Sequence, residues 1–203
     1  MLTTPGHPLA TELPDEALVD WHERELLGRL EGARVLDIGC GAARNSRWLA
    51  QQGAIVEGID LAAPLLDHVR PTMPESVTLT AMDVLRDPLP VGQFDLVYDS
   101  GCFHHIGPHR RITYLERVLP AVRPGGRFAI VTFAAERMET PNDREIVMSG
   151  NTHGGMAFSL DDLRHMFAAL QPIELRAVRS DREDAFGPDF LNAALLTAGR
   201  QVT

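Results

Sequence analysis

Apolar runs alternate with helix-like segments through the first 133 residues, and this alternation constrains the fold more than any other feature. The apolar runs predict strands at residues 34–38, 54–60, 76–80, 94–99 and 125–133. Helical patterns lie between them at residues 43–53, 63–70 and 109–122. Strands that alternate with helices are typical of a parallel α/β sheet with right-handed crossovers and helices on both faces.

The two ends of the chain extend this pattern. Residues 15–30 predict a helix capped by Asp15, within an N-terminal helical cap over residues 1–33. Ser159 is the expected cap of a helix at 160–170, and two further strands are predicted at 172–180 and 190–198. Because 203 residues can bury one core but are few for two, we expect a single domain over residues 1–203.

Charge and composition exclude several classes of function. The net charge is −9, which argues against nucleic-acid or membrane partners. All 19 basic residues are Arg, so mechanisms that need a Lys Schiff base or a P-loop Lys are excluded. The N-terminus lacks the basic and apolar regions of a signal peptide, and the two cysteines match no disulfide or zinc pattern, so we expect a cytoplasmic monomer or homodimer without a metal.

The stretch Leu36–Ser46, "LDIGCGAARNS", places Gly39 and Gly41 between a strand and a helix. A dinucleotide-binding fingerprint would require a third glycine where Arg44 stands, which disfavours an NAD-dependent oxidoreductase. Asp60 and Asp83 follow the next two predicted strands. Because the carboxyl ends of parallel strands share one edge, these acids are expected to line one rim of the sheet, where Asp60 can accept ribose hydroxyls.

Several motifs occur in order, namely "VLDIGCGAARNS", "EGID", "AMDV", "FDLVYDSGCFHHI" and "VRPGGRF". Together they resemble the class I S-adenosylmethionine (SAM) methyltransferases, within which "GAARNSRWLAQQG" and "DSGCFHHI" are similar to the tellurite-resistance and thiopurine branches. The resemblance implies a Rossmann-like, doubly wound sheet of seven strands in the order 3-2-1-4-5-7-6, with the seventh antiparallel. It implies SAM as cofactor, S-adenosylhomocysteine (SAH) as product, and cofactor contacts from Asp37, Gly39, Cys40, Gly41, Arg44, Asp60, Leu61, Met82, Asp83, Val84 and Asp99.

The motif "YDSGCFHHI" after the fourth strand concentrates reactive side chains. Asp99 departs from the small polar residue that the family has there, and it can bind the SAM amino group or an amine substrate. We predict Asp99 and His104 as the catalytic candidates, because a His side chain titrates near neutral pH. Neighbouring side chains are expected to point apart, so His104 and His105 should not both contact one ligand or metal. The motif lacks the G-x-S-x-G elbow of a hydrolase.

Residues 134–158 interrupt the alternation with a long polar, glycine-containing stretch at the expected ligand-binding edge. We expect this structureless insertion to act as a substrate lid. The candidate substrate contacts are Trp21, His105, Arg137, His153 and Met156.

The favoured function is in-line methyl transfer from SAM to the N, S or O atom of a small molecule in a dry pocket. The alternatives are a SAM-binding protein that transfers no methyl group and, less favoured, an NAD-dependent oxidoreductase.

Overall fold

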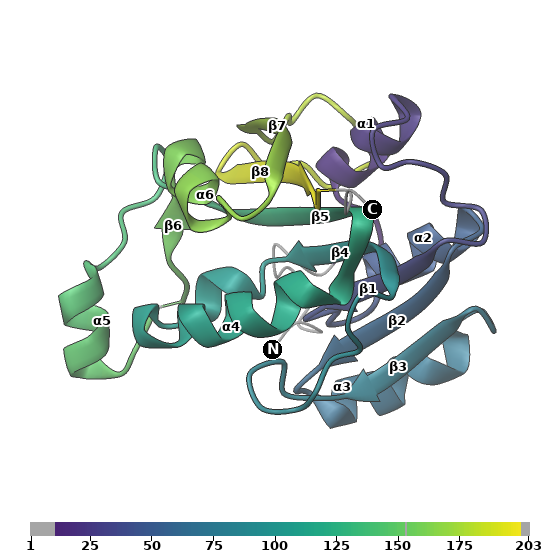
Figure 1. Cartoon of the computed structure of the whole chain (residues 1–203), viewed down its shortest axis with the longest axis horizontal. Helices are drawn as coiled ribbons and strands as arrows, with labels where there is room; N and C mark the ends of the chain where they lie inside the picture. The colour runs from purple at the N-terminus through teal and green to yellow at the C-terminus, as the bar shows by residue number, and fades with distance from the viewer. Residues whose placement is uncertain (1–10, 153, 200–203) are drawn as a thin grey trace.

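A mixed β-sheet forms the centre of the computed structural model, which describes residues 11–152 and 154–199 (Figure 1). The strands are β1 (Arg34–Ile38), β2 (Ile55–Asp60), β3 (Val77–Ala81), β4 (Phe94–Ser100), β5 (Val122–Ala134), β6 (Ala157–Phe158), β7 (Gln171–Ala177) and β8 (Leu191–Thr197). Their order is β3-β2-β1-β4-β5-β8-β7, and β6 pairs separately with β5. β1 to β5 run parallel, and β8 is antiparallel to both β5 and β7. Apart from the two-residue β6, this is the predicted order.

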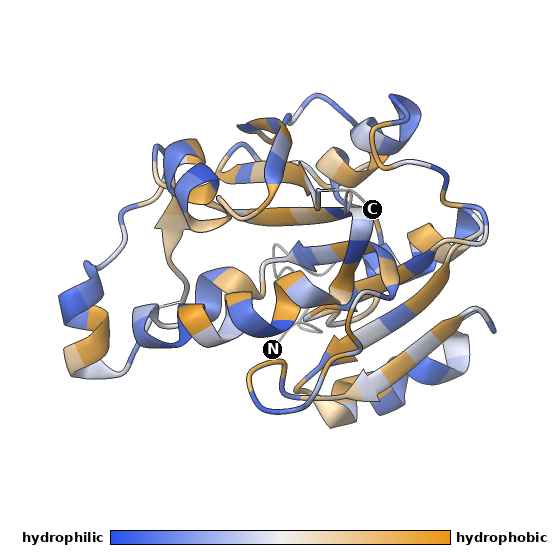
Figure 2. Cartoon of the chain, in the orientation of Figure 1, coloured by the Kyte–Doolittle hydropathy of each residue, from blue (hydrophilic) through white to orange (hydrophobic). Residues whose placement is uncertain are grey.

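Helices cover both faces of the sheet, as the alternation predicts. They are α1 (Glu16–Glu23), α2 (Arg44–Gln51), α3 (Ala63–Val69), α4 (Arg111–Val118), α5 (Asp143–Ser149) and α6 (Leu160–Met166). Successive side chains of a strand point to opposite faces. Ala129 and Val131 of β5 therefore pack in the core under α1, α2 and α3, whereas Phe128 and Ile130 pack under α4 and α6, and α5 lies away from the sheet (Figure 1). Figure 2 shows apolar residues running along β5 and β8 between these two layers.

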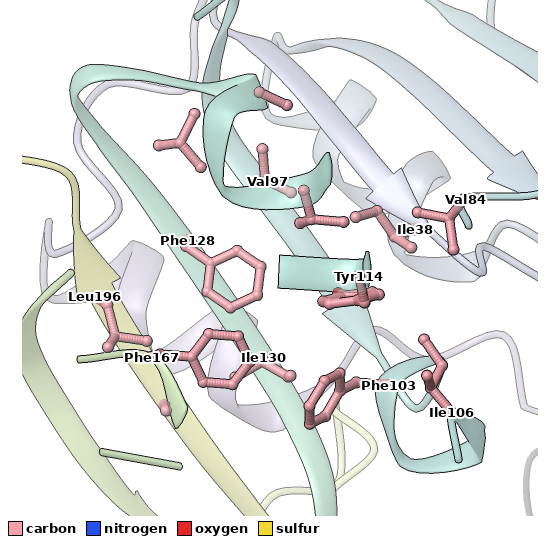
Figure 3. Packing of buried hydrophobic residues seen from close by; sticks show 14 of the residues in the cluster. Ile38, Val84, Val97, Phe103, Ile106, Tyr114, Phe128, Ile130, Phe167 and Leu196 are labelled. Carbon is pink, nitrogen blue, oxygen red and sulfur yellow. The ribbon is translucent and has the colours of Figure 1, made fainter. Parts of the chain in front are cut away.

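A cluster of aromatic rings supports the turn that follows β4. Phe103 begins a short 3₁₀ turn, Phe103–His105, and is fully buried. Its ring lies 5.0 Å from the Tyr114 ring and 5.4 Å from the Phe167 ring, measured between centroids (Figure 3). Burying a large aromatic side chain stabilises its position by about 1.5–3 kcal/mol. This packing therefore anchors the two histidines that come next in the chain.

The first helix differs from its prediction. It ends at Glu23 rather than continuing to residue 30, and the side chain of Asp15 does not cap it. Instead, Asp15 accepts hydrogen bonds from Tyr98 Oη at 2.5 Å and from Asn45 Nδ2 at 2.9 Å, and it pairs with Arg44. These long-range partners hold the segment before α1 against α2 and β4.

The expected lid contains more regular structure than the sequence indicated, whereas the end of the chain forms the predicted helix and two strands. Ser159 caps α6 as predicted, in a capping box with Asp162. The segment 134–158 is not structureless, because it contains α5 and β6. Asn142 and Glu145 form a capping box at the start of α5. This reciprocal pair of hydrogen bonds satisfies backbone N–H groups that the first helical turn leaves free.

Candidate functional site

A cavity of about 340 Å³ opens at the carboxyl ends of β1, β2, β4 and β5. The chain reverses its winding direction between β1 and β4, and open α/β sheets bind ligands at this point. The lining residues come from the loops after the strands and from the segment before β8. They include Asp37, Gly39, Cys40, Gly41, Arg44, Asp60, Leu61, Met82, Val84, Cys102, His104, His105, Val131, Phe133, Phe186 and Leu191.

The glycine loop after β1 requires its glycines for a steric reason. Gly39 has φ +65°, and a Cβ atom there would lie 2.6 Å from Cys102 Cβ. The N–H of Gly41 donates to Oδ2 of Asp60 at 2.9 Å, and Ala62 N–H donates to Oδ1 at 2.8 Å. Since each carboxylate oxygen has two lone pairs, Asp60 keeps acceptor capacity at the mouth of the cavity. The loop after β1 and the acid after β2 thus form one unit.

Burial sets the protonation of groups at the base of the cavity. Asp37 is 1% exposed and accepts a hydrogen bond from Ser46 Oγ at 2.5 Å. Desolvation raises the pKa of Asp37 to about 7, although the Ser46 hydrogen bond opposes this shift. Desolvation also raises the pKa of the Cys40 and Cys102 thiols. Both cysteines are therefore protonated at neutral pH and are poor nucleophiles.

The acid after β3 lies apart from the cavity, although its two neighbours line it. Oδ1 of Asp83 accepts the N–H of Leu85 at 2.9 Å, and Oδ2 lies 3.4 Å from Nε of Arg86. Met82 and Val84, on either side of it, are lining residues. Met82 and Val84 therefore lie at the cavity, as the sequence predicts, whereas the carboxylate of Asp83 forms the hydrogen bond that closes a turn.

Asp99 is turned into the protein rather than toward the cavity. Its side chain is fully buried and accepts from the N–H groups of Cys102 and Phe103 at 2.9 and 3.1 Å and from Tyr114 Oη at 2.5 Å. Burial raises its pKa to about 6, against the effect of these three donors. Because Asp99 is absent from the cavity lining, the geometry favours a positioning role over the direct catalytic and cofactor contacts expected from the sequence.

The two adjacent histidines lie against each other, which corrects the expectation that they point apart. Their rings meet edge to face with centroids 4.4 Å apart, and their Nε2 atoms are 3.2 Å apart. The 3₁₀ turn explains this, because successive side chains turn by about 120° there rather than alternating. Desolvation, then the neighbouring His105, lowers the pKa of His104 to about 3, and desolvation also lowers that of His105. Both rings are neutral at pH 7.

The remaining predicted substrate residues are scattered. Trp21 of α1 is fully buried and its Nε1–H donates to Glu174 at 2.7 Å, so it packs in the core away from the cavity. Arg137 is exposed outside the cavity lining. Met156 is buried behind the lining and donates its backbone N–H to the His104 carbonyl at 2.8 Å. His153 lies outside the residues that the structure describes.

Sequence reasoning missed the aromatic part of the cavity. Phe133 lies next to the end of β5, at the same edge as the glycine loop, and this position could have identified it. Phe186 and Leu191 enter from the far end of the chain, and no local pattern marks them. Phe186 also carries the Arg44 guanidinium 4.9 Å above its ring centroid. Its backbone bonds to Pro14 and Glu16, which ties the cavity wall to the N-terminal segment.

Comparison with known proteins agrees with this arrangement. The family profile described as "Methyltransferase domain" matches residues 35–126. An uncharacterised methyltransferase of Synechocystis sp. is 34% identical over 102 residues, which cover 49% of this chain and 47% of that protein. The alignment therefore spans about half the length of this curated relative.

Two solved structures share the fold over most of the chain. A SAM-dependent methyltransferase from Mesorhizobium loti has a TM-score of 0.68 at 19% identity and covers 88% of this chain and 97% of its own. A 1,6-didemethyltoxoflavin N1-methyltransferase from Burkholderia thailandensis, solved with that compound and SAH, has a TM-score of 0.66 at 25% identity, covering 91% and 80%. Residues 35–126 thus match the family described as a methyltransferase domain, and the sheet order agrees with the fold of solved SAM-dependent methyltransferases.

Proposed function

We propose that this protein transfers a methyl group from SAM to a small-molecule nucleophile in the cavity at the carboxyl edge of the sheet. The observation that carries the proposal is the hydrogen bond between Gly41 N–H and Asp60, which joins the glycine loop and an acid at a cavity that also holds His104 and Phe133. The toxoflavin-type enzyme with the same fold, whose compound is a small molecule, supports this class of substrate.

The residues present fit the cofactor. The loop at Gly39 brings backbone close to the cavity where a Cβ atom would be excluded, and Asp60 retains acceptor sites for two ribose hydroxyls. Met82 and Val84 supply apolar contacts for a flat base, with Leu61 exposed beside them. When bound, SAM supplies a methyl group activated by a sulfonium, and an acceptor lone pair displaces it in line.

The chain contributes alignment and exclusion of water rather than a strong base. His104 and His105 are neutral and border the cavity, whereas the carboxylate of Asp99 holds the turn that carries them. Holding two reactants in line can supply a large part of a rate acceleration without proton transfer. We propose that residues 134–158 help to close this site, because Met156 bonds directly to the His104 backbone.

Calorimetry with SAM, SAH and NAD tests the cofactor, and SAH formation with a panel of thiols, phenols, amines and heterocycles tests the reaction. Binding of SAM but not NAD, with acceptor-dependent SAH formation, is the expected result. Tight NAD binding without SAM binding would overturn the proposal. SAM binding without SAH formation from any acceptor would favour a protein that binds SAM and transfers no methyl group.

We find no helix, within residues 11–152 and 154–199, that combines the length and the apolar character needed to cross a membrane. The sequence motifs "GAARNSRWLAQQG" and "DSGCFHHI" support our proposal that the protein resembles the tellurite-resistance and thiopurine branch. Substrates of those branches are one arm of the acceptor panel.

A further inference from the structure

We propose that the acceptor is a small, uncharged, flat aromatic or heteroaromatic molecule, bound where His104, His105, Phe133, Phe186 and Leu191 line the cavity. We call these five residues the acceptor end. The inference rests on the proposed function, because it assigns the part of the cavity that the cofactor leaves free.

The sheet order separates Phe133 and Leu191 of the acceptor end from the cofactor residues. β1, β2 and β3 lie on one side of β4, and they carry the glycine loop, Asp60 and the Met82–Val84 segment. β5 and β8 lie on the other side, and there Phe133 pairs with Leu191 in the strand register. An acceptor must approach the methyl group from the side opposite the cofactor sulfur, so the β5–β8 side remains for it.

Aromatic side chains dominate this side of the cavity. The His104 ring stacks on the Phe133 ring with centroids 4.0 Å apart and planes 10° apart, and His105 meets His104 edge to face. Phe186 adds a ring from the segment before β8. Offset-stacked and edge-to-face contacts between rings contribute about 0.5–1.5 kcal/mol beyond burial of area, which corresponds to roughly 2- to 12-fold in affinity.

Among the described lining residues, those of the acceptor end carry no net charge that could pair with an ionic acceptor. The nearby cation, Arg44, bonds to the Leu13 carbonyl and pairs with the buried carboxylate of Asp15. His104 and His105 are neutral, because burial lowers the pKa of both. An ionised thiolate, halide or ammonium would lose its hydration here without a counter-charge, which is strongly unfavourable.

The size of the cavity limits the acceptor to a small molecule. The whole cavity is about 340 Å³, near the lower end of the range of about 300–1,000 Å³ for ligand pockets, and the cofactor must share it. One or two fused rings fit this limit better than a long chain or a macromolecular segment.

The test is calorimetry on the SAH-loaded protein with two sets of matched probes. One set is indole, indole-3-carboxylate and 3-(aminomethyl)indole. The other set is quinoline, quinoline-3-carboxylate and 3-(aminomethyl)quinoline, which are likewise neutral, anionic and cationic. We expect the neutral member of at least one set to bind about tenfold or more tightly than both charged members. Phe133→Leu, which keeps apolar volume but removes the ring, should weaken that binding about fivefold.

Phe128→Leu is the matched control, because Phe128 lies on the same strand but packs in the opposite core. It should leave probe affinity unchanged, and SAH affinity should be unchanged in both variants. A charged member that binds as tightly as its neutral partner, or no binding of either neutral ring up to its solubility limit, would overturn the inference. Titration with SAH alone, performed first, tests cofactor binding separately, and SAH formation with the acceptor panel tests methyl transfer.

Discussion

The imidazole of His104 lies flat against the ring of Phe133, and the backbone of Gly155 crosses the edge of this stack. A Cβ atom on Gly155 would lie 2.7 Å from Cε2 of Phe133 and 3.1 Å from Cδ2 of His104. The next residue, Met156, donates its N–H to the His104 carbonyl. The segment after α5 is thus fitted directly onto the wall of the acceptor end.

Gly155→Ala should destabilise the protein more than Gly154→Ala. Both glycines have positive φ, +133° and +99°, so both substitutions introduce backbone strain, but a Cβ atom on Gly154 would meet nothing within 4 Å. Overpacking at Gly155 should cost about 1–3 kcal/mol more in the free energy of unfolding. Urea denaturation of the two variants measures this difference, and equal losses would show that the stack accommodates the added methyl group.

Asp60→Asn should weaken SAH binding by at least about tenfold, because charge-assisted hydrogen bonds contribute about 1.5–3 kcal/mol each. Asp83→Asn should weaken it less, since the Asp83 carboxylate is engaged with Leu85 and Arg86. Calorimetry on both variants, with circular dichroism to verify folding, makes the comparison. Unchanged affinity in Asp60→Asn would place the ribose elsewhere.

Tyr114→Phe and Asp99→Asn should act through the turn that carries the histidines. Removing the Tyr114 hydroxyl leaves a buried carboxylate short of one donor, which should cost about 1–3 kcal/mol of stability. If Asp99 positions the turn, both variants should lower turnover while the pH profile of the remaining activity keeps its shape. A stable Asp99→Asn protein whose profile loses one limb would instead make Asp99 a proton acceptor.

The stability that Asp37 and Asp99 contribute should fall as the pH rises from about 4 to about 7, whereas His104 and His105, whose pKa values are lowered in the folded protein, act in the opposite direction. The folded protein holds protons on Asp37 and Asp99, whose pKa values are raised from 3.8 to about 7 and about 6, after the unfolded chain has released them. Their contribution is therefore complete below pH 3.8 and is lost as the pH rises through the folded values. Each unit of pKa difference corresponds to about 1.4 kcal/mol.

Asp37→Asn removes the titration of one of these groups. Relative to the unmodified protein, the variant should gain stability between pH 5 and pH 8, since the buried charge at Asp37 never forms. Urea denaturation at several pH values in this range measures the difference. Parallel pH dependence in the two proteins would contradict the assignment of this effect to Asp37.

The amino-acid sequence by itself determined the sheet and the part of the cavity formed at and after the ends of β1, β2 and β3. Periodicity marks β1 to β5, and the glycines and Asp60 stand at strand ends, which a parallel sheet must bring to one edge. Met82 and Val84 come after β3 and line the cavity for the same reason. These residues are predictable because local pattern and chain direction alone decide where they lie.

Only the tertiary structure determines which residues form the acceptor end and which hydrogen-bond partners the buried acids have. Phe186 and Phe133 are more than fifty residues apart in the sequence, and they line one cavity because β5 pairs with β8 and Phe186 bonds to Pro14 and Glu16. The local sequence predicts that Asp15 caps a helix and that Asp99 is a catalytic acid. In the structure, Asp15 accepts a hydrogen bond from buried Tyr98, and Asp99 accepts one from buried Tyr114. A buried carboxylate must satisfy its hydrogen bonds with whatever packing brings near, and no local sequence pattern specifies those partners.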